Sequence, residues 1–135
     1  MGGRGASSGI SIFKKAYGSE YHTVKINGVP LVVGNIKFIK QNKKGSATAP
    51  METMTKGRVY AFIDSGDRLN SIIYFNTKLK RKKSINLLHD HKDIKGAHTH
   101  EGYFHDENGT RRLTMKEKRM VARVEKIWYN RLSKL

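Results

Sequence analysis

The chain has 135 residues, of which 37% are hydrophobic and none is cysteine. This length predicts one domain with one modest core, and the lack of cysteine excludes a disulfide framework, a thiolate zinc site and a cysteine nucleophile. The 27 Lys and Arg residues against 11 Asp and Glu give a formal net charge of +16, which favours nucleic acid as a partner, because phosphates attract scattered basic side chains.

Two alternatives to nucleic acid stay open: the chain is merely basic, or it binds an acidic protein or lipid. A membrane is not an expected partner, because no run approaches the roughly 20 apolar residues that a membrane span needs. The first ten residues, MGGRGASSGI, also lack the apolar core of a secretory signal. We therefore expect a soluble protein in a reducing cytoplasm.

The N-terminal residues are expected to form a flexible leader over 1–19, because their Gly- and Ser-rich start has little to bury. A single α+β domain is expected over residues 20–135. Its first strands are predicted in YHTVKI and in VPLVVGNIKFIK, which Asn27-Gly28 joins in a two-residue hairpin turn. Pro30 indicates that the second of these strands starts late or lies at an edge.

The segment 41–56 is rich in Gly, Pro and small polar residues and is expected to be a surface loop that could cover a site. Three β-rich runs follow at 58–64, 69–75 and 80–88, and their short connections predict an antiparallel meander. Both faces of the middle run are apolar, which is typical of a central strand. The basic run 78–83 is expected at the edge of the meander, either as a guard against edge pairing or as a nucleic-acid-binding run.

The C-terminal region contains the clearest helix. Thr114 and Glu117 have the spacing of a capping box, and apolar residues then recur at helical spacing as far as Leu132. Trp128 lies on this stripe, where we expect it to be core rather than a base-stacking platform. The predicted fold is therefore α+β, with an antiparallel β-meander of about four to six strands packed against a C-terminal α-helix.

Five of the six histidines lie in HDHKDIKGAHTHEGYFH, residues 89–105. Such a cluster suggests metal ligation, proton transfer or a pH-sensitive surface. Residues two apart in an extended segment point to the same side, so His98 would pair with His100, and His89 with His91. A purely structural role, as loop or hydrogen-bonded packing residues, stays open for all of them.

Two chemistries fit such pairs. In metal-free RNA cleavage one imidazole takes the proton of the ribose 2′-OH, another group protonates the leaving 5′-oxygen, and Lys or Arg holds the phosphate charge. In metal binding, two imidazoles are joined by a third ligand such as His105, Asp93 or Glu101, around zinc or manganese. Five of the eleven acidic residues lie in or just after this segment, which favours orienting imidazoles or holding a metal over gripping phosphate.

The candidate residues fall into three sets. The catalytic candidates share the histidine-rich segment: His98, His100, His89, His91, Glu101, Tyr103 and His105. The alternative metal ligands are His98, His100 and His105. The nucleic-acid-binding candidates are basic side chains of the meander, the histidine-rich segment and the helix region: Lys80, Arg81, Lys82, Lys83, Lys95, Arg111, Arg112 and Arg119.

Four stretches resemble a group of small proteins of Firmicutes phages and prophages: MGGRGASSG, SATAPMETMTKGRVY, AHTHEGYFH and LTMKEKRMVARVEKIWYN. More loosely, a strand followed by a small residue and H-x-H resembles the histidine core of the Barnase–EndoU–colicin–RelE-like class of phage and toxin ribonucleases. This resemblance implies a small α+β fold, RNA as substrate and metal-free catalysis by His98 and His100, in a bacterial host cytoplasm or in the virion. In that class helices usually precede the sheet, whereas the helix expected here follows it.

The leading hypothesis is a phage-derived, metal-independent ribonuclease that needs no cofactor. His98 would be the base, His100 or His89 the acid, and Arg111 or Lys95 would contact the phosphate. The alternatives are a noncatalytic nucleic-acid-binding or virion accessory protein and a metal-dependent nuclease with His and carboxylate ligands.

Overall fold

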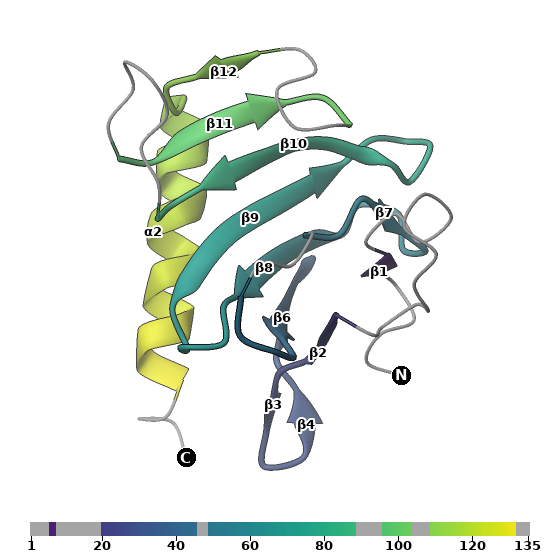
Figure 1. The fold of residues 1–135 in the computed structure, drawn as a ribbon, viewed down its shortest axis with the longest axis vertical. Coiled ribbons are helices and arrows are strands. Elements are labelled where there is room, and N and C mark those ends of the chain that lie inside the picture. The colour runs from purple at the N-terminus through teal and green to yellow at the C-terminus, as the bar shows by residue number, and fades with distance from the viewer. Residues whose placement is uncertain (1–5, 8–19, 46–48, 89–95, 104–108, 132–135) are drawn as a thin grey trace.

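The computed structural model describes residues 6–7, 20–45, 49–88, 96–103 and 109–131. In this part of the chain, one face of a large β-sheet is covered by a single long helix, α2 (Met115–Asn130) (Figure 1). This is the predicted α+β arrangement, with the helix after the sheet. The sheet is larger than expected, however, with eight strands, and it is mixed, because β6 and β8 run parallel. No helix among the described residues is long and apolar enough to cross a membrane.

The main sheet has the strand order β12-β11-β10-β9-β8-β6-β2, and β5 also pairs with β6. Its strands are β2 (Tyr21–Thr23), β5 (Val32–Val33), β6 (Ile36–Gln41), β8 (Val59–Ile63), β9 (Leu69–Phe75), β10 (Arg81–Asn86), β11 (His98–Glu101) and β12 (Thr110–Arg111). Two small sheets pair β1 (Ala6–Ser7) with β7 (Glu52–Thr53), and β3 (Lys25–Ile26) with β4 (Val29–Pro30). Of the expected leader the structure describes only β1, so a flexible leader over 1–19 stays a prediction.

The N-terminal strands form two hairpins rather than one. Asn27 and Gly28 have φ angles of 52° and 80° and form the predicted two-residue turn between β3 and β4. The single strand expected after this turn is wrong, because Val33 pairs with Ile36 in a second hairpin. Gly34 permits that turn with a φ of 61°, a conformation that glycine adopts without a Cβ clash.

The meander is confirmed, and it extends further than predicted. β8, β9 and β10 pair antiparallel, and β11 and β12 continue the series. β9 is covered on both faces, since Ile72 belongs to the core under α2 and Ile73 to a second cluster on the opposite face. The expected edge position of the basic run 78–83 is wrong, because β10 hydrogen-bonds to β9 on one side and to β11 on the other.

The helix begins as its sequence predicts. The Thr114 hydroxyl accepts a hydrogen bond from the Glu117 backbone N–H, and the Glu117 carboxylate accepts one from the Thr114 N–H. Near the other end, Trp128 is 2% exposed and stacks on Phe38, with ring centroids 5.8 Å apart. Its indole N–H donates to the Asp67 carbonyl at 2.9 Å. The prediction that Trp128 is a core residue is confirmed.

The sheet face opposite α2 is only partly apolar. Its apolar cluster consists of Tyr21, Ile39, Tyr60, Phe62 and Ile73. The described part of the predicted loop 41–56 packs beside this cluster, through Ala49 and through Thr53, whose hydroxyl lies 3.1 Å from that of Tyr60. Toward β10 and β11 the same face becomes polar, and the candidate site lies there.

Candidate active site on the sheet face opposite the helix

His98 and His100 lie on one face of β11, as the alternation in the sequence predicts. That face points away from α2, because Thr99 between them donates to the Glu117 carboxylate of α2 at 3.1 Å. The neighbouring positions on β10 are Asn86 beside His98 and Ser84 beside His100. Both histidines are buried, at 1% and 5% exposure.

The two imidazoles are hydrogen-bonded to each other. Their Nε2 atoms are 3.1 Å apart, and the rings meet edge to face at 86° with centroids 4.7 Å apart. His98 Nδ1 lies 2.8 Å from the Gly96 carbonyl oxygen, and His100 Nδ1 lies 2.9 Å from the Thr110 hydroxyl. We call His98 and His100 in this arrangement the histidine pair.

The hydrogen bonds described here fit one arrangement of the protons of the pair. A carbonyl only accepts, so His98 carries a proton on Nδ1, and its Nε2 is a lone-pair acceptor when the ring is neutral. His100 then donates from Nε2 to His98. The Thr110 hydroxyl both donates and accepts, so it suits a neutral His100 and a protonated one equally. The two Nε2 atoms therefore present one base and one proton donor at a single point.

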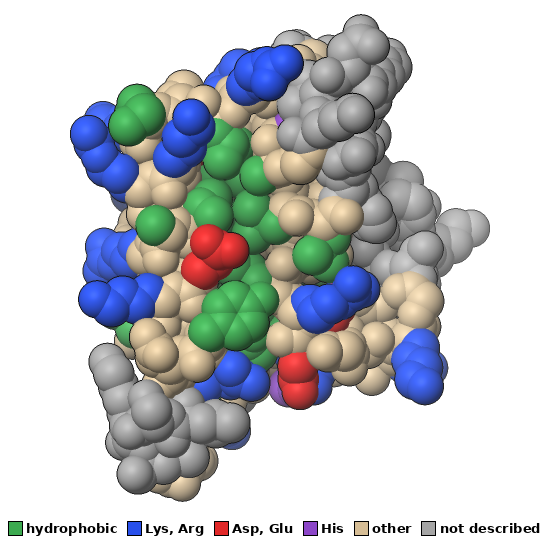
Figure 2. All heavy atoms as spheres, turned by 90° about the vertical axis from the view of Figure 1, so that its left-hand side faces the viewer, with side chains coloured by type: hydrophobic (Ala, Val, Ile, Leu, Met, Phe, Trp, Pro, Cys, Tyr) green, Lys and Arg blue, Asp and Glu red, His purple; other side chains and the backbone are tan. Residues whose placement is uncertain are grey.

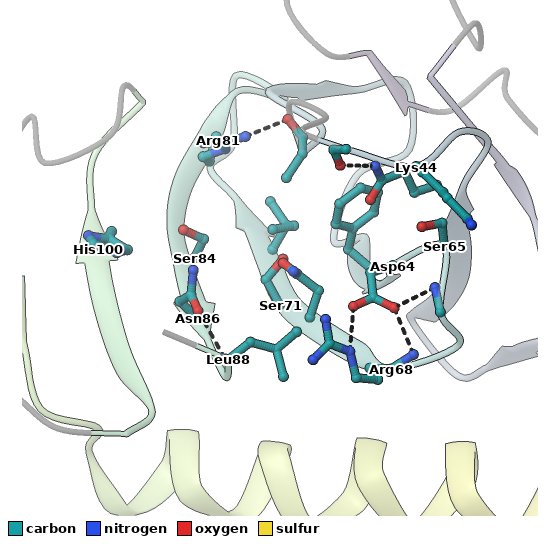
Figure 3. A pocket seen from close by; sticks show the side chains of 17 residues that line it. Lys44, Asp64, Ser65, Arg68, Ser71, Arg81, Ser84, Asn86, Leu88 and His100 are labelled. Atoms are coloured by element: carbon teal, nitrogen blue, oxygen red, sulfur yellow. Dashed lines mark hydrogen bonds and ion pairs between the residues drawn. The ribbon is translucent and has the colours of Figure 1, made fainter. Parts of the chain in front are cut away.

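His100 borders a polar hollow of about 710 Å³, and His98 lies behind it, hydrogen-bonded to His100. Figure 3 shows His100 on one side of it, the short polar side chains of β9 and β10 along its floor, and charged side chains on the far side. The floor is formed by Ser71, Ser84 and Asn86, and the far side by Lys44, Asp64 and Arg68. Arg68 is paired with Asp64, the Nε to Oδ2 distance being 2.9 Å. The loop 41–56 does border this site, through its residues Lys44, Gly45 and Ala49.

Arg81 is the unusual cation of the hollow. Its guanidinium donates from Nε to the Pro50 carbonyl at 3.1 Å and from Nη2 to the Ala49 carbonyl at 2.5 Å. Burial lowers the pKa of Arg81 to about 10. Within the described residues its hydrogen bonds thus go to neutral carbonyls and not to a carboxylate. A partly desolvated cation with no carboxylate among its described partners favours an anionic ligand.

Arg111 and Lys83, which were also predicted to contact nucleic acid, form ion pairs on the opposite face of the sheet. Both bind the buried Glu117 carboxylate: Arg111 through two nitrogens at 2.8 and 2.9 Å, and Lys83 at 2.7 Å. Burial alone would raise the pKa of Glu117, but the hydrogen bonds from Arg111 and Lys83 hold it far below its usual range. We call these three residues and Thr99 the Glu117 network.

The histidine-rich segment is only partly described. Glu101 points away from the histidine pair. It lies on the α2 face of β11 and accepts a hydrogen bond from Arg111 at 3.0 Å. Tyr103 is half-buried, and its ring centroid lies 5.4 Å from Lys80 Nζ. Four candidates lie outside the described residues: His89, His91, His105 and Lys95. In the described part of the chain no group of three or more His, Asp or Glu could hold a metal ion.

The remaining predicted nucleic-acid contacts are exposed. They are Lys80, Lys82, Arg112 and Arg119. Figure 2 views the side of the molecule where α2 lies, and its Lys and Arg side chains stand at separate places around a band of hydrophobic side chains. This side therefore carries scattered positive charge rather than one continuous basic stripe.

The sequence did not identify Thr110 or Gly96 as parts of the site, and it named Arg81 only as a member of the basic run, without placing it near the histidines. A sequence pattern did mark Ser84 and Asn86, since they alternate with the buried Ile85 along β10 and so lie on the other face of that strand. No local pattern marks Thr110, because its contact with His100 depends on the pairing of β12 with β11.

No family model, curated protein or solved structure matches this chain in the comparisons with known proteins.

Proposed function

We propose that this protein binds RNA across the hollow and cleaves it without a metal ion, by acid–base catalysis at the histidine pair. One observation carries this proposal: the two Nε2 atoms, 3.1 Å apart, are held by Gly96 and Thr110 as a base and a proton donor, and His100 of this pair lines the hollow. General acid–base catalysis of phosphodiester transfer needs such a pair.

The hollow supports a polymeric anion as substrate. Arg81 and Ser84, the neighbour of His100, are three residues apart on β10, about 10 Å along a strand. A polynucleotide that lies across the hollow is long enough to contact both Arg81 and His100, at different phosphates. The net charge of +16 favours the same partner.

In the reactive state the pair carries one proton more than when both rings are neutral. His100 is then an imidazolium that donates from Nδ1 to Thr110, and His98 keeps its Nε2 lone pair. RNA replaces the hydrogen bond within the pair. The 2′-OH gives its proton to His98 as its oxygen bonds to phosphorus, the bond from phosphorus to the 5′-oxygen breaks, and His100 protonates that oxygen.

In this proposal Arg81 takes the phosphate-binding role first expected of Arg111. At that separation from His100, its guanidinium would hold a neighbouring phosphate of the bound strand and so position the chain at the histidine pair. Arg81 keeps hydrogen-bonding capacity for such a ligand, because its bonds to Ala49 and Pro50 use Nε and Nη2. Arg111, in contrast, has Nε, Nη1 and Nη2 all bonded to Glu101 or Glu117.

The test uses three labelled oligonucleotides of one sequence: RNA, DNA, and DNA with a single ribonucleotide. With EDTA present, we expect cleavage of the RNA, cleavage of the mixed strand only after its ribonucleotide, and a product that ends in a 2′,3′-cyclic phosphate. The His22→Gln variant, which changes an exposed histidine bonded to Asn42, should cleave like the wild type. Cleavage of all-DNA strands, or activity that EDTA abolishes and manganese restores, would contradict the proposal. Tight binding without cleavage would leave a noncatalytic nucleic-acid-binding protein.

A further inference from the structure

The two Nε2 atoms of the histidine pair have nearly the separation of two ligands on one zinc ion. Zinc binds imidazole nitrogen at about 2.0–2.1 Å in a tetrahedral arrangement, which places two such nitrogens about 3.3–3.4 Å apart. The observed separation is 3.1 Å. A metal ion between the rings would therefore require them to part by only a few tenths of an ångström.

The far sides of both rings already have the partners that metal-bound histidines use. A histidine that binds a metal through one nitrogen usually donates the other N–H to a carbonyl or another oxygen, which fixes the ring. His98 Nδ1 donates to the Gly96 carbonyl, and the Thr110 hydroxyl can accept from His100 Nδ1. When the His100 proton moves from Nε2 to Nδ1, both Nε2 lone pairs face the same point.

We infer that Zn²⁺ binds between His98 Nε2 and His100 Nε2, in place of the hydrogen that these atoms share. Water from the hollow that His100 borders would supply further ligands, since the described side chains beside the pair on β10, Ser84 and Asn86, carry no carboxylate. Two imidazoles suit zinc better than manganese, which prefers oxygen ligands.

Bound zinc would also stop RNA cleavage, since it occupies the base and the proton donor together. This consequence rests on the proposed function, whereas the binding itself does not. Zinc would act as an inhibitor of a reaction that needs no metal.

The experiment titrates zinc chloride into metal-free protein by calorimetry, at a pH where the wild type is stably folded. We expect one zinc ion per chain. His98→Gln and His100→Gln should each weaken binding by at least the 10–100-fold that loss of an outer-shell partner causes, and Thr110→Val by about tenfold. Circular dichroism melting without zinc checks that each variant is folded.

Two control variants separate this site from the other histidines. The triple substitution His89→Gln, His91→Gln and His105→Gln should keep zinc binding with unchanged stoichiometry, and so should His22→Gln. Loss of binding in the triple variant, or binding that survives in a His98→Gln, His100→Gln double variant, would overturn the inference.

The RNA assay then tests the consequence. Zinc at saturating concentration should inhibit cleavage by the wild type and by the triple variant, and EDTA should restore it. Zinc that accelerates cleavage would overturn the inhibitory role and make the pair a metal-dependent catalytic centre. If no RNA cleavage is found at all, the proposed function fails, and the calorimetry still decides whether the histidine pair binds zinc.

Discussion

The two faces of β11 hold polar side chains in opposite ways. On the face toward α2, Thr99 donates to Glu117 and Glu101 binds Arg111. The charge of Glu117, which is 1% exposed, is neutralised by Arg111 and Lys83. On the other face, His98 and His100 share a hydrogen bond beside a hollow where Arg81 has no carboxylate among its described hydrogen-bond partners.

This difference separates stability from chemistry. A buried carboxylate with two cations and a backbone N–H has little capacity left for a ligand, and its main effect is to fix the start of α2 against β10 and β12. The histidine pair, in contrast, is a hydrogen-bonded proton donor and acceptor, of which His100 lines the hollow. Strand alternation places the two sets one residue apart, so they can be broken separately.

The largest effect is expected when the histidine pair is changed. His98→Gln or His100→Gln should lower the rate of RNA cleavage by about a hundredfold or more, because acid–base catalysis contributes roughly 10²–10⁴. RNA affinity should stay within a few-fold. The wild-type rate should form a bell in pH, because one group acts as the base and the other as the acid, and each variant should lose one limb of it.

Thr99→Val is the matched control, since it changes the residue between the two histidines on the other face of the strand. It should leave the cleavage rate within about threefold of the wild type and cost about 1–2 kcal/mol of stability through the lost hydrogen bond to Glu117. Equal losses of activity in Thr99→Val and His100→Gln would mean that β11 acts only as a structural element.

The next effect concerns stability. Glu117→Gln should lower the free energy of unfolding by about 3–5 kcal/mol, because it leaves Lys83 and Arg111 without their shared carboxylate. Urea denaturation measures this difference. Well below its melting temperature, the variant should cleave RNA at the wild-type rate, which would confirm that the Glu117 network is not part of the chemistry.

The sequence predicted those parts of the molecule that depend on neighbouring residues. The Asn27-Gly28 turn, the capping box of Thr114 and Glu117, and the common side of His98 and His100 follow from local geometry, which a short pattern records. The structure agrees with each of these predictions.

The parts that the sequence did not predict depend on which strands are neighbours. The position of β10 inside the sheet turned an expected edge run into residues with separate roles: Arg81 faces the hollow, and Lys83 binds Glu117. A register shift between Arg81 and Lys83 accompanies this separation. Arg111 is brought beside Glu117 by the pairing of β12 with β11. No residue spacing in the sequence predicts that strand pairing.

A third prediction uses pH to isolate the Glu117 network. The pKa of Glu117 is below its usual range in the folded protein, so its contribution to stability is full above the unfolded value of about 4.3 and is lost as pH falls toward the folded value. The stability difference between wild type and Glu117→Gln should therefore shrink by about 1–2 kcal/mol between about pH 5 and pH 3. A difference that stays constant over this range would show that Glu117 does not stabilise the fold through its charge.

The smallest effect decides which side of the molecule meets RNA. Lys44 is exposed at the rim of the hollow, and Lys126 is exposed on α2. Each lysine that contacts a phosphate contributes about one unit to the dependence of log affinity on log salt, which corresponds to about a three- to fourfold change in affinity between 50 and 200 mM salt. Lys44→Gln should therefore flatten the salt dependence by about one unit, and Lys126→Gln should leave it unchanged. A Lys80→Gln, Lys82→Gln double variant tests the exposed part of the predicted basic run in the same titration. The reverse result, with Lys126→Gln flattening the slope and Lys44→Gln having no effect, would place RNA on the helix and remove it from the histidine pair.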